Sequence, residues 1–120
     1  MAEGWVNHLL GDRWEARSAG TAPADAVHPL AVAVMREVGV DLSGARPDHV
    51  ETFRHEAWDL VVTVCDSAKE SCPVFPGPVS RLHVGFEDPA DAVGSMEARL
   101  EVFRRVRDEI RDQLIPQLVA

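Results

Sequence analysis

The sequence predicts a single α/β domain in which helices alternate with the short strands of a parallel sheet. A continuous run of apolar, β-branched residues at 60–64 is typical of a strand that is buried on both faces of such a sheet. A long amphipathic stripe near the carboxyl end predicts a helix with one core-facing side. The chain has 120 residues, of which 46% are hydrophobic and 27% are charged. We therefore expect residues 1–120 to share one core.

The first expected element is a short helix over Ala2–Leu10 that ends at Gly11. The apolar side chains expected on one side of this helix are Trp5, Val6, Leu9 and Leu10. Trp14–Ser18 is a candidate strand, which Ala19-Gly20 closes.

The second expected helix follows a loop at His28-Pro29, runs through Val38 and ends at Gly39. A turn over residues 40–44 comes next. Pro47 then suits the first turn of a short helix, because its fixed φ angle is compatible with that position.

Two strands are expected in the middle of the chain. Leu60–Val64 forms the first and carries Cys65 at its carboxyl end, and Ser80–Val84 is the second. The segment Asp66–Cys72 between them is expected to form a short helix or a turn before a proline-rich stretch. Because strands alternate with helices, we expect right-handed crossover connections.

The last helix is expected to begin after Gly94, with Ser95 as its N-cap. Its apolar stripe repeats at spacings of four and three residues and consists of Met96, Leu100, Phe103, Val106, Ile110 and Leu114. Pro116 is expected to disrupt the end of this helix. A stripe of this kind is typical of core packing rather than of a groove for a partner.

The charge and hydropathy of the chain argue against two classes of partner. Twelve Lys and Arg residues against twenty Asp and Glu residues give a net charge of -8, and the basic residues are scattered. Such a chain would repel a nucleic acid backbone. No apolar run approaches the ~18 residues of a membrane span, and the first residues lack the pattern of a signal peptide. We therefore expect a soluble, cytoplasmic protein that binds neither nucleic acid nor membranes.

The two cysteines, Cys65 and Cys72, are the first candidates for chemistry. Cys65 follows the carboxyl end of a strand, where open α/β sheets place their ligand sites. A helix between two residues seven positions apart would hold their Cα atoms ~10 Å apart, beyond the ~7 Å that a disulfide spans. A disulfide would then require this helix to unwind, as in a redox switch. Two inert, buried thiols are the alternative. A zinc site would need more ligands, since only His83 follows nearby.

Several oxygen-bearing side chains are weaker candidates. Asp88 lies in a loop with a second carboxylate after the last strand, where it could act as a general acid. An ordinary Asp-Pro turn explains the same residues. Glu3, Ser18 and Asp48 lie near the ends of expected elements, where helix caps or solvated positions are the alternatives.

Motifs spread over most of the chain resemble those of thioredoxin-coupled arsenate reductases. They are MAEGW, RSAG, HPLAVAVMREVGVDLSG, DLVVTVCDSAKESCPVFPG, FEDPA and VFRRVRDEIR. The segment with both cysteines and its CPVFPG tail is the most specific of these motifs. The resemblance implies the fold of the low-molecular-weight tyrosine phosphatases, which is a three-layer sandwich around a parallel sheet.

The resemblance also implies a relay of three thiols that reduces arsenate to arsenite for detoxification. A first cysteine, in an N-terminal CX5R phosphate loop, attacks arsenate. The thiol that matches Cys65 attacks the adduct and releases arsenite, and the thiol that matches Cys72 resolves the exchange. Thioredoxin would then reduce the resulting Cys65-Cys72 disulfide.

Other residues gain expected roles from the same resemblance. Asp88 matches the general acid of the phosphatase-like step. Glu3, Ser18 and Asp48 match positions that support a monovalent cation near the phosphate loop. No organic cofactor is implied.

The chain departs from the family pattern at its first residues. Family members have a strand and the CX5R loop directly before the segment that matches MAEGW, and this sequence contains neither. We therefore expect residues 1–120 to be an N-terminally truncated domain that lacks its first central strand, its first thiol and its oxyanion-binding arginine. Such a chain would expose strand edges. It should be unstable, oligomeric or dependent on a complementing segment.

Two other functions compete with an arsenate reductase. A non-catalytic, redox-responsive remnant or binding module would keep the Cys65 and Cys72 pair without turnover. A low-molecular-weight tyrosine phosphatase is the other alternative. It is disfavoured because Ala90 and Asp91 stand where phosphatases usually carry aromatic residues, and because the chain contains no Tyr.

Overall fold

The computed structural model describes residues 1–20, 27–42, 44–45, 48–53, 55–64 and 79–119. In chain order its elements are helix α1 (Ala2–Leu10), helix α2 (Pro29–Glu37), the 3-10 turn η1 (Val50–Phe53), strand β1 (Leu60–Thr63), strand β2 (Ser80–His83), the 3-10 turn η2 (Pro89–Asp91) and helix α4 (Met96–Val119). This order confirms the expected α/β class. The expected helix or turn at 66–72, together with Cys65 and Cys72, lies outside the described residues.

The described sheet consists of two parallel strands, as expected. Its paired residues are Leu60 and Ser80, Val61 and Arg81, Val62 and Leu82, and Thr63 and His83. All four residues of β1 are only partly buried. The expectation of a strand buried on both faces is therefore wrong for the described structure, because the described α-helices cover one face of the sheet.

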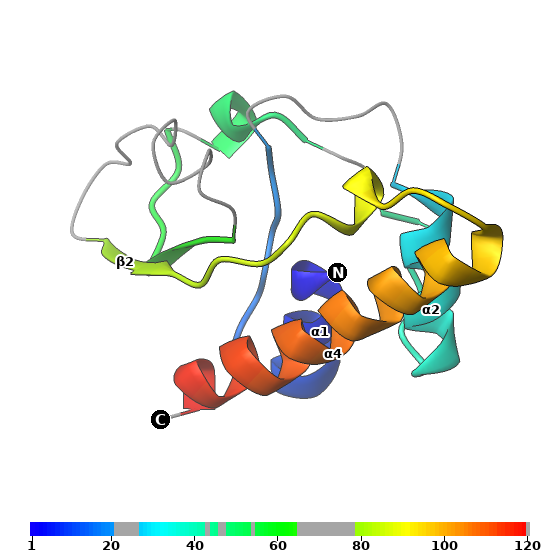
Figure 1. Cartoon of the computed structure of the whole chain (residues 1–120). Helices are drawn as coiled ribbons and strands as arrows, with labels where there is room; N and C mark the ends of the chain where they lie inside the picture. The colour runs from blue at the N-terminus through cyan, green and yellow to red at the C-terminus, as the bar shows by residue number, and fades with distance from the viewer. Residues whose placement is uncertain (21–26, 43, 46–47, 54, 65–78, 120) are drawn as a thin grey trace.

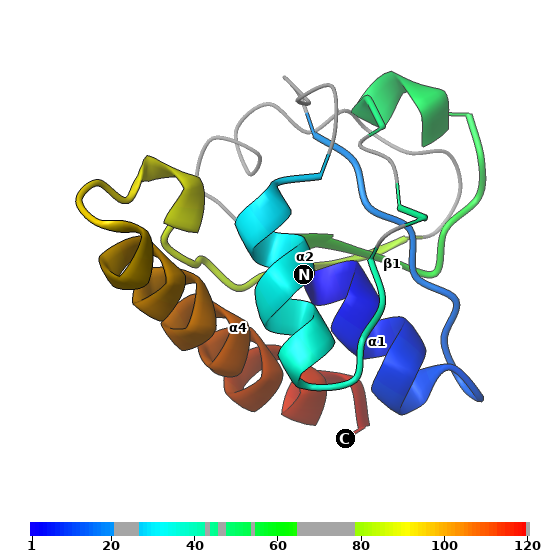
Figure 2. The ribbon, with the colours of Figure 1, turned by 90° about the vertical axis from the view of Figure 1, so that its right-hand side faces the viewer.

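Helices α1, α2 and α4 lie together on that face (Figure 1; Figure 2). Helix α4 packs against both of the others. The buried residues of the main core are Trp5, Val6, Leu10, Met35, Val40, Leu42, Val84, Val106, Ile110, Leu114 and Leu118. Leu60, Val62 and Leu82 pack against this core from the sheet. Because side chains alternate along a strand, the side chains of the residues next to these three in each strand point to the opposite face of the sheet.

Local signals set the ends of the helices where the sequence predicts them. The ring Nδ1 of His28 accepts a hydrogen bond of 3.1 Å from the N–H of Leu30 and so caps α2. Gly39, with φ of +82°, follows the end of this helix in a conformation that favours glycine. At α4, the Ser95 hydroxyl accepts a hydrogen bond of 3.1 Å from the N–H of Ala98.

A buried arginine joins the three helices. Arg107 donates from Nη1 to the carbonyl of Val34 and to Oε1 of Glu37, at 2.9 Å in each case. Its own carbonyl accepts a hydrogen bond of 3.0 Å from the Trp5 indole. Arg104 binds both carboxylate oxygens of Glu37. Hydrogen bonding to Arg104, followed by that to Arg107, lowers the pKa of Glu37 to about 2.

The expectation of a strand at Trp14–Ser18 is wrong. The backbone of Ala16, in this segment, bonds to the side chain of Asn7 instead of to a neighbouring strand. Asn7 Nδ2 donates to the carbonyl of Ala16 at 3.1 Å, and the N–H of Ala16 donates to Asn7 Oδ1 at 2.9 Å. An isolated parallel bridge between Gly20 and His49 is the nearest ladder contact.

Two residues assigned to apolar stripes are exposed. Leu9 is 44% exposed, because successive residues of a helix are about 100° apart and Leu10 occupies the core-facing position. Met96 is 57% exposed and is the first residue of α4. The core-facing stripe of α4 thus begins further along the helix than predicted.

The predicted break of α4 at Pro116 is also wrong, since the helix continues to Val119. The buried side chain of Leu118 holds the last turn against the core, and the Trp14 indole donates a hydrogen bond of 3.2 Å to its carbonyl. Although α4 has 24 residues, no helix in the described part of the chain combines the length and the apolar character that a membrane span requires.

Candidate active-site region

The carboxyl ends of β1 and β2 lie side by side. Thr63 Oγ1 and His83 Nδ1 are 2.7 Å apart. The pairing continues past the strands, because the N–H of Phe86 donates to the carbonyl of Val64 at 2.8 Å. This edge is where open α/β sheets bind their ligands. Sequence analysis considered His83 only in arguing against a zinc site, although its place at the end of a strand that pairs with β1 could have indicated the contact with Thr63.

Asp88 lies in the loop that follows β2. It is exposed and forms the N-cap of η2, where its Oδ1 accepts a hydrogen bond of 3.0 Å from the N–H of Ala90. The Asp-Pro turn considered from the sequence is therefore present. It fixes the carboxylate at the surface, near the carboxyl end of the sheet.

An ion pair anchors this loop to α4. Arg105 Nη2 lies 2.5 Å from Oε2 of Glu87, and Arg105 Nη1 lies 3.2 Å from Oε1 of Glu109. The hydrogen bond to Glu87 is the main cause that raises the pKa of Arg105. Sequence analysis did not single out this anchor. The spacing of Arg105 and Glu109 signals a helical pair, but nothing local connects either residue to Glu87.

The structure brings Glu3, Ser18 and Asp48 together, since all three line a cavity of about 230 Å³. Glu3 Oε1 accepts a hydrogen bond of 3.1 Å from the N–H of Ser18, and Glu3 Oε2 accepts one of 3.2 Å from the Ser18 hydroxyl. The carbonyl of Asp48 accepts a hydrogen bond of 2.9 Å from the N–H of Gly20. Residues that are far apart in the sequence thus form one polar wall.

The oxygen atoms of this wall have the chemistry of ligands for a hard cation. Within the residues that the structure describes, no three His, Cys, Asp or Glu side chains form a group that could hold a metal ion. A cation at the cavity would therefore depend on the Ser18 hydroxyl and on backbone carbonyls in addition to the two carboxylates.

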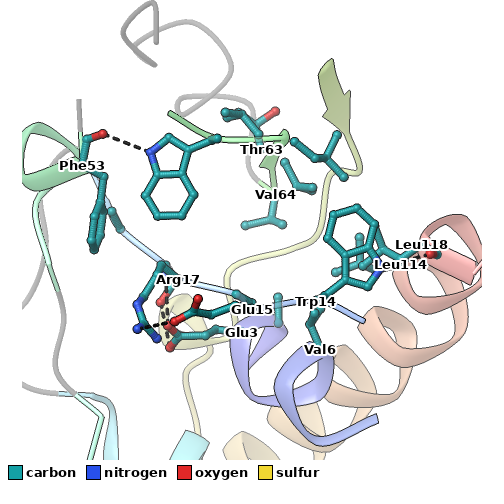
Figure 3. Close-up of a pocket in the computed structure, with 18 of the residues that line it drawn as sticks. Glu3, Val6, Trp14, Glu15, Arg17, Phe53, Thr63, Val64, Leu114 and Leu118 are labelled. Atoms are coloured by element: carbon teal, nitrogen blue, oxygen red, sulfur yellow. Dashed lines mark hydrogen bonds and ion pairs between the residues drawn. The ribbon is translucent and has the colours of Figure 1, made fainter. Parts of the chain in front are cut away.

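A larger cavity of about 250 Å³, which we call the apolar groove, lies beside β1 (Figure 3). Its lining includes Val6, Trp14, Phe53, Trp58, Leu114 and Leu118. Trp58 donates a hydrogen bond of 3.0 Å to the carbonyl of Phe53, and the two rings meet edge to face with centroids 5.5 Å apart. Glu3 and Ser18 also line this groove, so it adjoins the polar wall. Sequence analysis did not predict it.

This chain is similar in sequence to a known protein family and to individual bacterial proteins. The model of the low molecular weight phosphotyrosine protein phosphatase family matches residues 1–120. A relative from Halalkalibacterium halodurans, named arsenate reductase, is 47% identical over 110 residues, which cover 92% of this chain and 78% of the relative. A relative of the same name from Bacillus subtilis is 46% identical over 114 residues, which cover 95% of this chain and 81% of the relative.

This chain is also similar to solved structures that are described as arsenate reductases. One described as an arsenate reductase in the oxidized state is 31% identical, with a TM-score of 0.77 over 93% of this chain and 80% of that chain. Another, described as an arsenate reductase in the phosphate binding state, is 30% identical, with a TM-score of 0.72 over 98% of this chain and 85% of that chain.

Proposed function

Because this chain belongs to the low molecular weight phosphotyrosine protein phosphatase family, we propose that it is an enzyme of that fold which reduces arsenate to arsenite in arsenic detoxification. The observation that carries the proposal is the identity of 47% and 46% to two relatives named arsenate reductase, over 92% and 95% of the chain. The likeness to solved structures of arsenate reductases supports the same activity.

The proposed reaction is a relay of thiols that transfers two electrons to arsenic. A first thiolate bonds to the arsenic of arsenate, and a protonated oxygen leaves as water. The Cys65 thiolate then attacks the sulfur of this adduct, so that an S–S bond forms, the S–As bond breaks and its electron pair stays on arsenic, which leaves as arsenite. Cys72 attacks the Cys65 sulfur and releases the first thiolate. Thioredoxin, a dithiol, reduces the resulting disulfide with two electrons and two protons.

This relay needs three thiols, and the chain has two cysteines. We propose that the first thiol, with an oxyanion-binding arginine, lies on polypeptide that precedes Met1, and that residues 1–120 form the remainder of the same domain. In support, about a fifth of each of the two bacterial relatives lies outside the part that matches this chain.

We assign to Asp88 the role of general acid. Loss of an oxygen from arsenate requires its protonation, which a positioned carboxylic acid supplies. Asp88 follows β2 while Cys65 follows β1, and these two strands end together. The ion pair of Glu87 with Arg105 restrains the loop that carries this acid.

We assign to Glu3, Ser18 and Asp48 the support of a monovalent cation beside the oxyanion. Their shared cavity and their oxygen donors favour this role. A cation there would hold the first turn of α1 and the polar wall in a fixed arrangement. We place the whole reaction in the cytoplasm, where thioredoxin keeps thiols reduced.

One observation favours a second candidate function. Since the chain carries only two cysteines, it could act as a redox-responsive module in which Cys65 and Cys72 form a reversible disulfide without turnover. A tyrosine phosphatase remains disfavoured by Ala90 and Asp91, which follow the Asp-Pro pair in place of aromatic residues.

An assay of arsenite formation with thioredoxin separates these candidates. The proposal predicts turnover by the chain extended through its upstream in-frame polypeptide, and loss of turnover in both Cys65→Ser and Cys72→Ser. Met96→Ser is the matched control, because it removes the sulfur of an exposed residue, and it should retain full activity. Full activity in either cysteine variant would contradict the relay. A reversible disulfide without arsenite formation would favour the redox module.

A further inference from the structure

The loop that carries Asp88, residues 85–88, makes few backbone contacts, and we call it the acid loop. The N–H of Phe86 donates a hydrogen bond of 2.8 Å to the carbonyl of Val64, and Phe86 packs against the main core. The next two residues, Glu87 and Asp88, are exposed. Among the described residues, the N–H groups of Glu87 and Asp88 make no backbone hydrogen bond. The position of Asp88 therefore depends on side-chain contacts.

Two side-chain contacts hold the end of the acid loop. Asp88 Oδ1 accepts a hydrogen bond of 3.0 Å from the N–H of Ala90, two residues further along the chain. Arg105 Nη2 lies 2.5 Å from Oε2 of Glu87, across 18 residues of sequence. The first contact fixes the carboxyl group relative to its own turn. The ion pair with Arg105 is therefore the polar contact that joins the acid loop to α4.

Helix α4 provides a rigid support for Arg105. The chain passes from β2 through the acid loop to the start of α4, and the helix then runs back below it in the view of Figure 1. Arg105 is an exposed residue of this helix, but Val106 beside it is buried in the core. Arg105 Nη1 also lies 3.2 Å from Oε1 of Glu109, one turn further along. Because the donors of a guanidinium have fixed directions, the contact with Glu109 orients Nη2 towards Glu87.

The exposure of this ion pair limits what it contributes to folding. The side chains of Arg105 and Glu87 are 50% and 55% exposed. An ion pair between such exposed side chains adds little to the free energy of folding, because water screens it. Its effect on a reaction is larger, since displacement of a catalytic group by ~1 Å slows catalysis by up to about 100-fold. The pair is therefore better suited to hold a reacting group in place than to stabilise the fold.

We propose that Arg105 is a positioning residue for arsenate reduction. By holding Glu87, it places the Asp88 carboxyl group where this acid protonates the arsenate oxygen that leaves as water. Glu109 assists by orienting the Arg105 guanidinium. Neither Arg105 nor Glu109 is required to contact the substrate. The inference rests on the general-acid role proposed for Asp88 and adds the residues that make this role efficient.

Single-turnover kinetics of the chain extended upstream of Met1 test this role. Because thioredoxin is absent, its reaction does not limit the rate of arsenite formation. For Arg105→Gln we expect the rate constant at saturating arsenate to fall about tenfold. The arsenate concentration at half-maximal rate should change less than about twofold, since the substrate loses no contact. Arg105→Lys keeps the charge and should recover most of the rate. Arg36→Gln, which removes an arginine from an exposed position of α2, is the matched control and should change neither quantity.

Double variants separate positioning from a structural role. Glu87→Ala should cause the same loss as Arg105→Gln, and combining the two should cause no further loss. In an Asp88→Asn background, Arg105→Gln should change the rate constant by less than about twofold, because the acid that it positions is absent. An unchanged rate constant for Arg105→Gln, or an equal fold loss with and without the Asp88 carboxyl group, would overturn the proposal. So would a change in the half-saturating arsenate concentration alone.

Hydrogen exchange tests the same positioning without arsenate. The N–H of Ala90 bonds to the Asp88 carboxyl group. Loss of the anchor should therefore make this amide exchange with deuterium about threefold faster in Arg105→Gln and in Glu87→Ala. The amide of Phe103, within α4, should be unaffected, which shows that the helix is intact. Unchanged exchange at Ala90 would overturn the positioning role. Absence of arsenite formation by the unmodified chain would instead contradict the proposed function, and the exchange at Ala90 would still decide whether Arg105 holds Asp88.

Discussion

Thr63 and His83 form a hydrogen bond of 2.7 Å across the carboxyl ends of the two paired strands. The two residues are also opposite each other in the ladder. Their contact therefore fixes where the strand before Cys65 and the strand before the Asp88 loop end. The proposed relay depends on this alignment, because it assigns to Asp88 the protonation of an oxygen on arsenic and to Cys65 the attack on the sulfur bonded to the same arsenic.

Thr63→Val removes the hydroxyl and keeps the β-branched shape. Because His83 loses this hydrogen bond, we expect the free energy of unfolding to fall by about 1 kcal/mol. Urea titration measures the change. Thr52→Val, at an exposed threonine of η1, is the control and should change the same quantity by less than about 0.5 kcal/mol. Equal stability of Thr63→Val and the unmodified chain would show that the contact does not hold the strand ends.

Glu37 should make stability depend on pH in the acidic range. Hydrogen bonds to Arg104 and Arg107 lower its pKa from 4.5 to about 2. Because the folded state has the lower pKa, the stabilisation is fully present above pH 4.5 and is lost as the pH falls to about 2. Glu37→Gln should therefore be less stable than the unmodified chain at neutral pH, and the difference should disappear near the folded pKa.

Urea unfolding at neutral pH and near the folded pKa measures this difference. The Glu37 side chain is 40% exposed, so added salt should also reduce the effect. Glu56→Gln, at an exposed glutamate, is the control and should show neither dependence. A stability difference for Glu37→Gln that persists unchanged at the acidic end would contradict the assignment.

Arg107→Met keeps much of the length of the side chain and removes its hydrogen bonds to Val34 and Glu37. Since the buried carbonyl of Val34 loses a donor, we expect the free energy of unfolding to fall by about 1–3 kcal/mol. Arg36→Met, at an exposed position of α2, controls for the change of residue type. A variant as stable as the unmodified chain would mean that apolar packing at this position replaces the hydrogen bonds fully.

Asp88→Asn should slow arsenate reduction in the chain extended upstream of Met1. Removal of a general acid lowers kcat by about 100-fold to 10,000-fold, whereas KM for arsenate should change little. Asp91→Asn, at an exposed carboxylate of η2, should behave like the unmodified enzyme. Similar kinetics for both variants would remove Asp88 from the reaction.

Elements with strong local patterns could be predicted from the sequence. The β-branched run at 60–63 and the amphipathic stripe of α4 each specify their element without a distant partner. Trp14–Ser18 could not be assigned correctly, because its backbone partners are the side chains of Asn7 and Glu3 rather than a strand. Pro116 was misread because tertiary packing of Leu118 outweighs the helix-breaking tendency of proline.

The site was only partly predictable for a similar reason. Motif resemblance, not spacing, connected Glu3, Ser18 and Asp48, and the cavity that they share depends on the tertiary fold. For Arg107 a local signal existed, since it lies four residues after Phe103 and three before Ile110, on the core-facing side of α4. Its charge argued against burial. The neighbouring Asp108 and, from α2, Val34 and Glu37 supply the partners that make burial favourable.

A single turnover with arsenate in the absence of reductant tests the central claim most directly. The extended chain is mixed with arsenate, arsenite is quantified, and the protein is alkylated, digested and analysed by mass spectrometry. The account predicts one arsenite per chain and a disulfide that joins Cys65 to Cys72, with both thiols protected from alkylation. Arsenite formed while both thiols remain free, or no arsenite from a folded chain that binds arsenate, would contradict it.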